Sequence, residues 1–179
     1  IAQLLLDEVG LPSFSTNEAE EMGTARCFGG DVVLTEEERQ RAMRSLMVLC
    51  EKYEGRISGS AGPLARAKMF NEIEERLERG ETGMPGRGTL CSCGGVFNKM
   101  AILHDGTMVP CNLLPSLSMG VAGIHSLRKA WLYHPSINAV RQRREIPLAA
   151  LPTCHDCPYT GFCAGGCPAT VMSKFGRIN

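Results

Sequence analysis

The stretch Cys154-His-Asp-Cys157-Pro-Tyr-Thr-Gly-Phe-Cys163-Ala-Gly-Gly-Cys167 decides how the second half of this chain is built. Four cysteines lie within fourteen residues, separated by two, five and three residues. The three glycines of the stretch give the backbone room to fold closely around a small group. Cysteines at this density, with a Cys-x-x-Cys pair among them, predict a metal centre.

Three further cysteines lie upstream, and the residues alone leave two kinds of metal open. The seven candidate ligands form two groups: Cys91, Cys93 and Cys111, then Cys154, Cys157, Cys163 and Cys167. Zinc takes four thiolates in a tetrahedron, usually from two well-separated pairs. Iron–sulfur clusters are also held by cysteine thiolates. Four cysteines in close succession favour iron–sulfur, with zinc as the alternative.

Composition and charge limit the classes of partner and the cellular compartment that we expect for this protein. The 179 residues carry 19 basic and 19 acidic side chains, so the formal net charge is zero. This balance gives no reason to expect a nucleic-acid groove or a membrane surface as partner. Nine cysteines, an odd number, suit thiolate ligands better than a closed set of disulfides. We therefore expect a cytoplasmic protein, with Cys27 as a free thiol and Cys50 as a thiol in the core.

The first half of the chain reads as helices that alternate with short strands. In chain order we predict a helix over 1–9, a strand over 11–15, a helix over 36–53, a strand over 55–60 and a helix over 63–79. Helical crossovers between parallel strands are typical of an α/β layer or barrel. Two strands do not close a barrel, and the chain begins within a helical pattern at Ile1. If this half belongs to a barrel, we expect most of that barrel to precede Ile1.

Local signals fix the two long helices of this half. Thr35 and Glu38 form a capping box, and Pro63 suits the first turn of the second helix. Apolar residues recur at spacings of three and four, which predicts one buried stripe on each helix. The stripes are Met43, Leu46, Met47, Cys50 and Tyr53, then Leu64, Met69, Phe70, Ile73 and Leu77.

The character of the chain changes after a linker at 81–88, which is rich in glycine. Asp105-Gly106 lies between the apolar runs 99–103 and 107–111, which predicts a β-hairpin with a type I′ turn. Short helices are expected over 126–133 and 136–144. We interpret His104 and His155 as solvent-facing turn residues and Trp131 and Tyr133 as packing residues.

The cysteine spacing of this half resembles the SPASM domain, the C-terminal extension of many radical S-adenosylmethionine (radical SAM) enzymes. Twelve residues separate Cys93 from Gly106, four separate Gly106 from Cys111, and the Cys-x2-Cys-x5-Cys-x3-Cys run follows. The segments 102–111, 127–131 and 163–168 also resemble that family. The resemblance divides the chain into the end of a radical SAM partial (β/α)6 barrel at 1–80, the linker, and a small α+β SPASM domain at 89–179.

The resemblance implies ligand sets for one or two auxiliary [4Fe–4S] clusters. The first cluster would be held by Cys91, Cys93, Cys111 and Cys167, and the second by Cys154, Cys157 and Cys163 with a fourth ligand that this sequence does not contain. The family also binds S-adenosylmethionine in its barrel. Since cofactor contacts lie at the carboxyl ends of parallel strands, Ser15, Asn17, Ser58 and Ser60 are candidates for this role.

The function implied is that of a maturase that modifies a peptide or protein side chain and receives electrons from a reductant such as a flavodoxin or ferredoxin. The Cys-x3-Cys-x2-Cys motif that holds the SAM-cleaving cluster in this family is absent from the sequence. We therefore expect the activity to belong to a longer parent protein. Two alternatives stay open: a stand-alone iron–sulfur electron-transfer module and a structural zinc module that binds a peptide partner.

Overall fold

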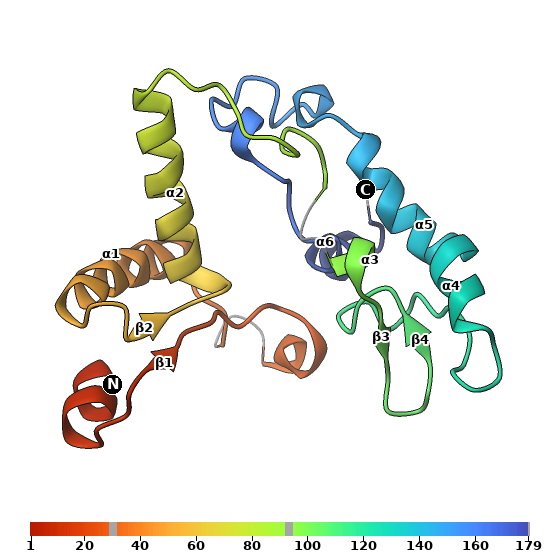
Figure 1. Ribbon diagram of the computed structural model, residues 1–179, viewed down its shortest axis with the longest axis horizontal. Helices are drawn as coiled ribbons and strands as arrows, with labels where there is room; N and C mark the ends of the chain where they lie inside the picture. The colour runs from red at the N-terminus through yellow and green to blue at the C-terminus, as the bar shows by residue number, and fades with distance from the viewer. Residues whose placement is uncertain (29–31, 92–94, 179) are drawn as a thin grey trace. The chain divides into compact units, whose positions relative to one another are not determined.

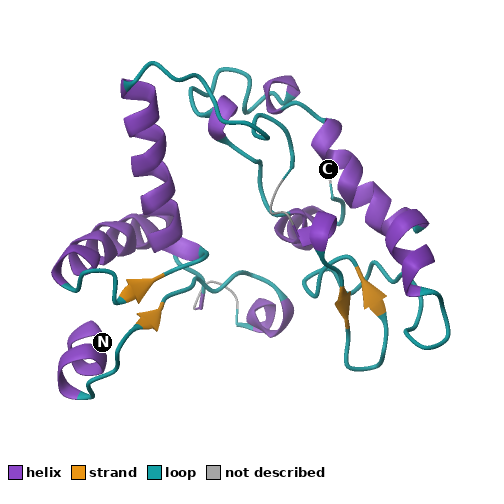
Figure 2. Cartoon of the chain, viewed as in Figure 1, coloured by secondary structure: helices purple, strands orange, loops and turns teal. Residues whose placement is uncertain are grey.

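The computed structural model describes residues 1–28, 32–91 and 95–178 (Figure 1). The chain forms two compact units, Ile1–Glu81 and Thr82–Asn179. Both mix helices with very short strands, which agrees with the predicted α/β character (Figure 2). Residues 82–88 form part of the second unit, where Met84 N donates to Gly161 O at 2.9 Å and Gly88 N donates to Cys163 O at 2.9 Å. No helix in the described ranges is long and apolar enough to cross a bilayer.

The first unit contains a parallel strand pair joined by a helical crossover. Its elements are η1 (Leu4–Glu8), β1 (Phe14–Ser15), η2 (Gly23–Cys27), α1 (Glu36–Lys52), β2 (Ile57–Ser58) and α2 (Gly62–Glu78). Phe14 pairs with Ile57 and Ser15 with Ser58, in parallel register. The crossover confirms the predicted order of elements. The strands are shorter than the sequence indicates, since only two residues of each form the ladder.

The start of α1 follows the capping box. Thr35 Oγ1 accepts a hydrogen bond from Glu38 N at 3.2 Å, and Glu38 Oε2 accepts one from Thr35 N at 2.9 Å. The bonds from Thr35 hold the pKa of the Glu38 carboxyl below its usual value. This reciprocal pair satisfies two backbone donors that the first helical turn leaves free.

The core of the first unit lies where η1, β2 and the two long helices meet. Its buried members are Ala2, Leu6, Tyr53, Ile57 and Leu64. The half-buried Cys50 packs against this core, and its Sγ lies 3.6 Å from Ile57 O, whereas Cys27 is exposed. The predicted stripe on α2 is wrong at Met69 and Phe70, which are 45% and 38% exposed. The buried residues of α2 are Pro63, Leu64, Ala67 and Ile73, and this helix packs against α1.

The second unit is built around a hairpin and a series of short helices. Its elements are α3 (Gly95–Asn98), β3 (Ala101–Ile102), β4 (Met108–Val109), α4 (Leu127–Tyr133), α5 (Pro135–Gln142), η4 (Arg143–Glu145), η5 (Leu148–Ala150), η6 (Thr160–Phe162) and α6 (Pro168–Phe175). The antiparallel pairing of β3 with β4 confirms the predicted hairpin (Figure 1). Helices α4 and α5 confirm the two short helices expected before the cysteine-rich stretch.

The hairpin turn differs from the type I′ turn that the sequence predicts. Gly106 has a φ of +83°, whereas Asp105 keeps a negative φ, and a type I′ turn requires positive values at both. Gly106 N donates to Leu103 O at 2.9 Å, so the loop is a three-residue turn that ends on a left-handed glycine. Asp105 Oδ1 accepts from Thr107 N at 2.9 Å, and this bond lowers the pKa of Asp105. The local carboxylate bond stabilises the alternative turn.

Strand β4 has hydrogen-bonding partners on both edges. On the edge away from β3, Met108 N donates to Gly120 O at 2.8 Å and Met119 N donates to Met108 O at 2.8 Å. Met108, Val109 and Met119 are buried as a result. Because β4 is hydrogen-bonded on both edges, the residues that follow it, including Cys111, have a defined position.

Candidate metal centre

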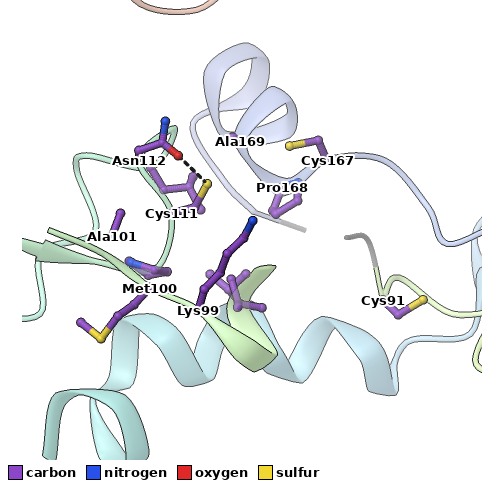
Figure 3. A pocket seen from close by; sticks show the side chains of 13 residues that line it. Cys91, Lys99, Met100, Ala101, Cys111, Asn112, Cys167, Pro168 and Ala169 are labelled. Atoms are coloured by element: carbon purple, nitrogen blue, oxygen red, sulfur yellow. Dashed lines mark hydrogen bonds between the residues drawn. The ribbon is translucent and has the colours of Figure 1, made fainter. Parts of the chain in front are cut away.

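One cavity in the second unit collects three of the predicted ligands. Cys91, Cys111 and Cys167 line a cavity of about 310 Å³, although they are far apart in the sequence (Figure 3). Much of its wall is apolar. The other lining residues are Val96, Lys99, Met100, Ala101, Pro110, Asn112, Leu114, Val140, Pro168 and Ala169. The structure thus brings together three of the four cysteines that the resemblance assigns to the first cluster.

Each of these three cysteines is positioned by a different element. Cys111 follows β4 directly after the buried Pro110, and its carbonyl accepts from Leu114 N at 2.8 Å. Cys167 is the N-cap residue of α6. Cys91 follows Leu90, whose backbone N–H donates to Ile146 O at 3.0 Å. The cavity therefore depends on contacts between hairpin, C-terminal helix and the start of the unit.

The three thiols do not yet converge on one point. Figure 3 shows the Cys167 sulfur directed to the side where Cys111 lies, while the Cys91 sulfur points away from both. The Cys91 thiol donates to Gly86 O at 3.2 Å, and the Cys111 thiol donates to Asn112 Oδ1 at 3.6 Å. Within the described ranges, no three Cys, His, Asp or Glu side chains are gathered closely enough to hold a metal ion.

The donor set and the cavity nevertheless fit an iron–sulfur cluster. Thiolates are soft ligands that select iron–sulfur clusters and zinc over hard cations such as Mg²⁺. Apolar walls limit solvent access, which is one of the factors that set a cluster's reduction potential. Ligation of a cluster by Cys91 and Cys111 would replace these two weak thiol hydrogen bonds. Cys93 lies outside the described residues.

A buried arginine places positive charge beside this cavity. Arg143 is 2% exposed, and its Nη2 lies 3.5 Å from the carbonyl oxygen of Gly166, the residue before Cys167. Burial lowers the pKa of Arg143, and the nearby Cys167 sulfur acts in the opposite direction. Since a guanidinium stays protonated in proteins, a permanent cation stands next to a candidate anionic ligand. Sequence reasoning missed Arg143, because no motif distinguishes it from the other arginines of the chain.

The other three candidate ligands lie on a single loop. The single proton of the Thr160 hydroxyl is shared between Cys154 O at 2.8 Å and Cys157 O at 2.7 Å, which closes the loop around the Cys-x-x-Cys turn. Gly165 N donates to Cys163 Sγ at 3.3 Å. Backbone N–H groups that donate to sulfur are typical of cysteine ligands in iron–sulfur proteins, where they adjust the potential. Cys157 and Cys163 are exposed, so this group lies at the surface of the unit.

Two glycines of the cysteine-rich stretch allow close packing that side chains would prevent. A Cβ on Gly161 would meet the carbonyl oxygen of Thr82 and lie 2.9 Å from Gly83 Cα. Gly165 has a φ of +71°, and a Cβ there would lie 2.5 Å from Leu90 Cδ2. The stretch is therefore packed tightly against residues 82–90, next to Cys91.

The two histidines and two aromatic residues considered in the sequence analysis lie outside the cavity. His104 and His155 are exposed, as interpreted from the sequence. Trp131 is half-buried and packed, whereas the packing role for Tyr133 is wrong because that ring is 71% exposed. Neither histidine joins the cavity.

The four predicted cofactor contacts of the first unit lie at one edge of its strand pair. Ser15 and Ser58 are ladder partners, Asn17 and Ser60 follow just beyond the strands, and all four are exposed. Their proposed role stays a prediction. Sequence reasoning missed Glu18 in the same segment, which is 3% exposed in its side chain and pairs with Arg39 at 2.7 Å. The run Glu18, Glu20 and Glu21 reads as a solvated face, and only the fold shows that one member is buried.

Comparison with protein families also indicates an iron–sulfur domain. Residues 91–158 match the family model of SPASM, an iron–sulfur cluster-binding domain, which confirms the predicted resemblance. The match includes five of the candidate ligands and ends before Cys163 and Cys167. Neither the curated proteins nor the solved structures contain a match to the chain.

Proposed function

We propose that this chain is the C-terminal part of a radical SAM enzyme that modifies a peptide or protein side chain, and that its SPASM half carries one or two auxiliary [4Fe–4S] clusters. One observation carries the proposal. Three cysteines from separate segments line one largely apolar cavity, in the half of the chain that contains the SPASM match.

Different residues of the second unit have different proposed roles at the cluster site. Cys91, Cys93, Cys111 and Cys167 are the proposed ligands of the first cluster, and a cluster bound there supplies one-electron redox chemistry or an anchor for substrate. Val96 and Leu114 exclude water from one wall of the cavity, and both are buried. Cys167 ties α6 to the hairpin through the shared site. Cys154, Cys157 and Cys163 are the proposed ligands of the second cluster.

The first unit contributes to cofactor binding in this proposal. Its parallel pair presents Ser15 and Ser58 side by side, with Asn17 and Ser60 beyond them. We assign this edge to S-adenosylmethionine or substrate in the parent enzyme, because ligands of parallel α/β units bind at the carboxyl ends of strands. The SAM-cleaving cluster motif would be supplied by another part of that parent. Its partners would be a peptide or protein substrate and a cytoplasmic reductant such as a flavodoxin or ferredoxin.

A stand-alone electron-transfer module is the second candidate function. The exposure of Cys157 and Cys163 supports it, because a cluster at the surface exchanges electrons readily with a partner protein. This candidate uses the same ligands and requires no S-adenosylmethionine.

Cysteine substitution tests the cluster assignment. Cys111→Ser and Cys167→Ser, prepared anaerobically with iron and sulfide, are expected to lose about four irons per chain, the content of one [4Fe–4S] cluster. Cys50→Ser is the matched control, since its thiol packs against the core of the first unit. Full iron content in both cavity variants would refute the assignment.

The gene itself tests the radical SAM parent. Sequencing upstream of the codon for Ile1 is expected to show an open frame that encodes a Cys-x3-Cys-x2-Cys motif. A stop codon directly before Ile1 would contradict this part of the proposal and favour the electron-transfer module.

A further inference from the structure

A second concave site lies in the second unit, on residues that the cluster proposal does not use. It is an open groove of about 680 Å³ formed where α3, α4, α5 and η4 meet. Helices α4 and α5 follow one another along one side of the unit (Figure 1). The groove combines aromatic rings, guanidinium groups and amides, which is a lining suited to a ligand with both charge and apolar surface.

Two arginines of the groove lie over two aromatic rings. The Arg141 Cζ is 4.3 Å from the centroid of the Trp131 ring, and the Arg144 Cζ is 5.1 Å from the centroid of the Phe97 ring. Stacking holds a guanidinium plane in place and leaves its N–H edge open to other partners. The groove therefore contains positively charged guanidinium groups that are held in place next to aromatic rings.

Arg141 serves the structure of the groove. Its Nε donates to Val96 O at 2.9 Å, and its Nη1 donates to Trp131 O at 2.6 Å and to Asn138 Oδ1 at 3.4 Å. These bonds connect α3, α4 and α5. Burial lowers the pKa of Arg141, which reflects its position inside this junction. The Trp131 ring is fixed as one wall of the groove.

Arg144 is placed differently and is the residue that can bind. It is exposed, and within the described part of the chain its guanidinium makes the ring contact with Phe97 but no ion pair. A guanidinium with a free fork binds a carboxylate through two parallel hydrogen bonds. Because the ring already orders the side chain, less conformational freedom is lost on binding.

The other polar residues of the groove narrow the class of ligand. Glu145 also lines it, so a polyanion such as a nucleic-acid backbone would meet a carboxylate as well as the guanidinium of Arg144. Gln142 offers an amide that can pair with a peptide group. A ligand with one carboxylate, neighbouring peptide amides and an apolar or aromatic group fits this lining best.

We propose that this groove binds a peptide segment with an acidic side chain next to an aromatic residue, with Arg144 receiving the carboxylate and Trp131 and Phe97 receiving the aromatic group. The identification of that peptide as part of a substrate rests on the proposed function. The binding chemistry rests on the groove alone.

Trp131 provides the assay, because it is the only tryptophan in the chain and lines the groove itself. The full 179-residue chain, prepared anaerobically with iron and sulfide, is titrated with the capped peptide acetyl-Gly-Glu-Phe-Gly-amide while its fluorescence is recorded. We expect a saturable change. The matched peptide with Gln in place of Glu should bind roughly tenfold more weakly, since it lacks the charge-assisted pair.

Two arginine substitutions that each remove one positive charge distinguish specific binding of the carboxylate from non-specific electrostatic attraction. Arg144→Gln should weaken binding of the Glu peptide roughly tenfold, because the bidentate partner is lost. Arg128→Gln should leave it unchanged, since Arg128 is exposed on α4 and does not line the groove. Arg144→Lys should bind with intermediate affinity, because it keeps the charge without the fork.

Three results would overturn the proposal: no saturable change in fluorescence, equal affinity for the Glu and Gln peptides, or equal affinity of the Arg144→Gln and Arg128→Gln variants. Iron content measured on the same samples reports separately on the cluster assignment. Peptide binding can therefore fail with the iron content intact, or succeed without it.

Discussion

Substitution of Gly161 by alanine tests whether the cysteine-rich stretch is packed as the structure shows. A Cβ at this position would meet the carbonyl oxygen of Thr82 and the Cα of Gly83. Both are backbone atoms, so no change of rotamer relieves the contact. Residues 160–162 and 82–84 must move apart, and the hydrogen bond from Met84 N to Gly161 O at 2.9 Å is then lost or weakened.

The free-energy cost follows from these two effects. Forcing a methyl group into a well-packed contact costs about 1–3 kcal/mol. Loss of one backbone hydrogen bond costs about 0.5–1.5 kcal/mol. Gly161→Ala should therefore lower the free energy of unfolding of the second unit by about 1.5–4.5 kcal/mol. Gly166→Ala is the matched control in the same stretch, because its Cβ would have nothing within 4 Å and its φ lies outside the left-handed region.

Urea unfolding followed by Trp131 fluorescence measures this difference in the unit concerned. With a slope of about 2 kcal/mol per molar urea, the midpoint of Gly161→Ala should fall by about 1–2 M. The midpoint of Gly166→Ala should stay close to that of the unaltered chain, since surface changes usually cost less than about 0.5 kcal/mol. Equal midpoints for the two variants under the same metal loading would refute the close approach of the two segments.

Two further predictions concern a buried charge beside the proposed cluster site and a carboxylate in the hairpin turn. Arg143→Met should lower the midpoint potential of the reconstituted chain in an anaerobic redox titration, because a buried cation stabilises the reduced cluster. An unchanged potential would show that Arg143 does not act on the cluster. The bond from Thr107 lowers the pKa of Asp105, so the hairpin should lose stability as the pH falls from the usual value of 3.8 towards the lower native value. Asp105→Ala should flatten that part of the pH profile of unfolding, and an identical profile in both proteins would show that the bond is absent.

The elements that the sequence predicts best are those fixed by neighbouring residues. The Thr35–Glu38 capping box specifies its helix start through two local hydrogen bonds, and the structure contains both. The hairpin at Asp105-Gly106 was also predictable, although its turn type was not. A short carboxylate bond from Asp105 competes with the type I′ geometry, and propensity alone does not reveal which arrangement is more stable.

The features that the sequence did not show depend on contacts between distant segments. Cysteine spacing suggested which residues ligate, but the cavity forms only when the hairpin, α6 and residues 89–91 pack together. The close approach of Gly83 to Gly161 has no local signature, since many glycines in the chain lie in open turns. Periodicity also placed Met69 and Phe70 in a buried stripe, because it does not reveal how many neighbours a helix has.

Metal analysis decides whether the second unit is an iron–sulfur domain. The chain is reconstituted anaerobically, and its iron, sulfide and zinc content is measured together with the visible absorption spectrum. We expect a brown protein with about four to eight irons and matching sulfide, the content of one or two [4Fe–4S] clusters. A colourless protein with about one or two zinc ions held by thiolates would contradict it and support a zinc-binding module.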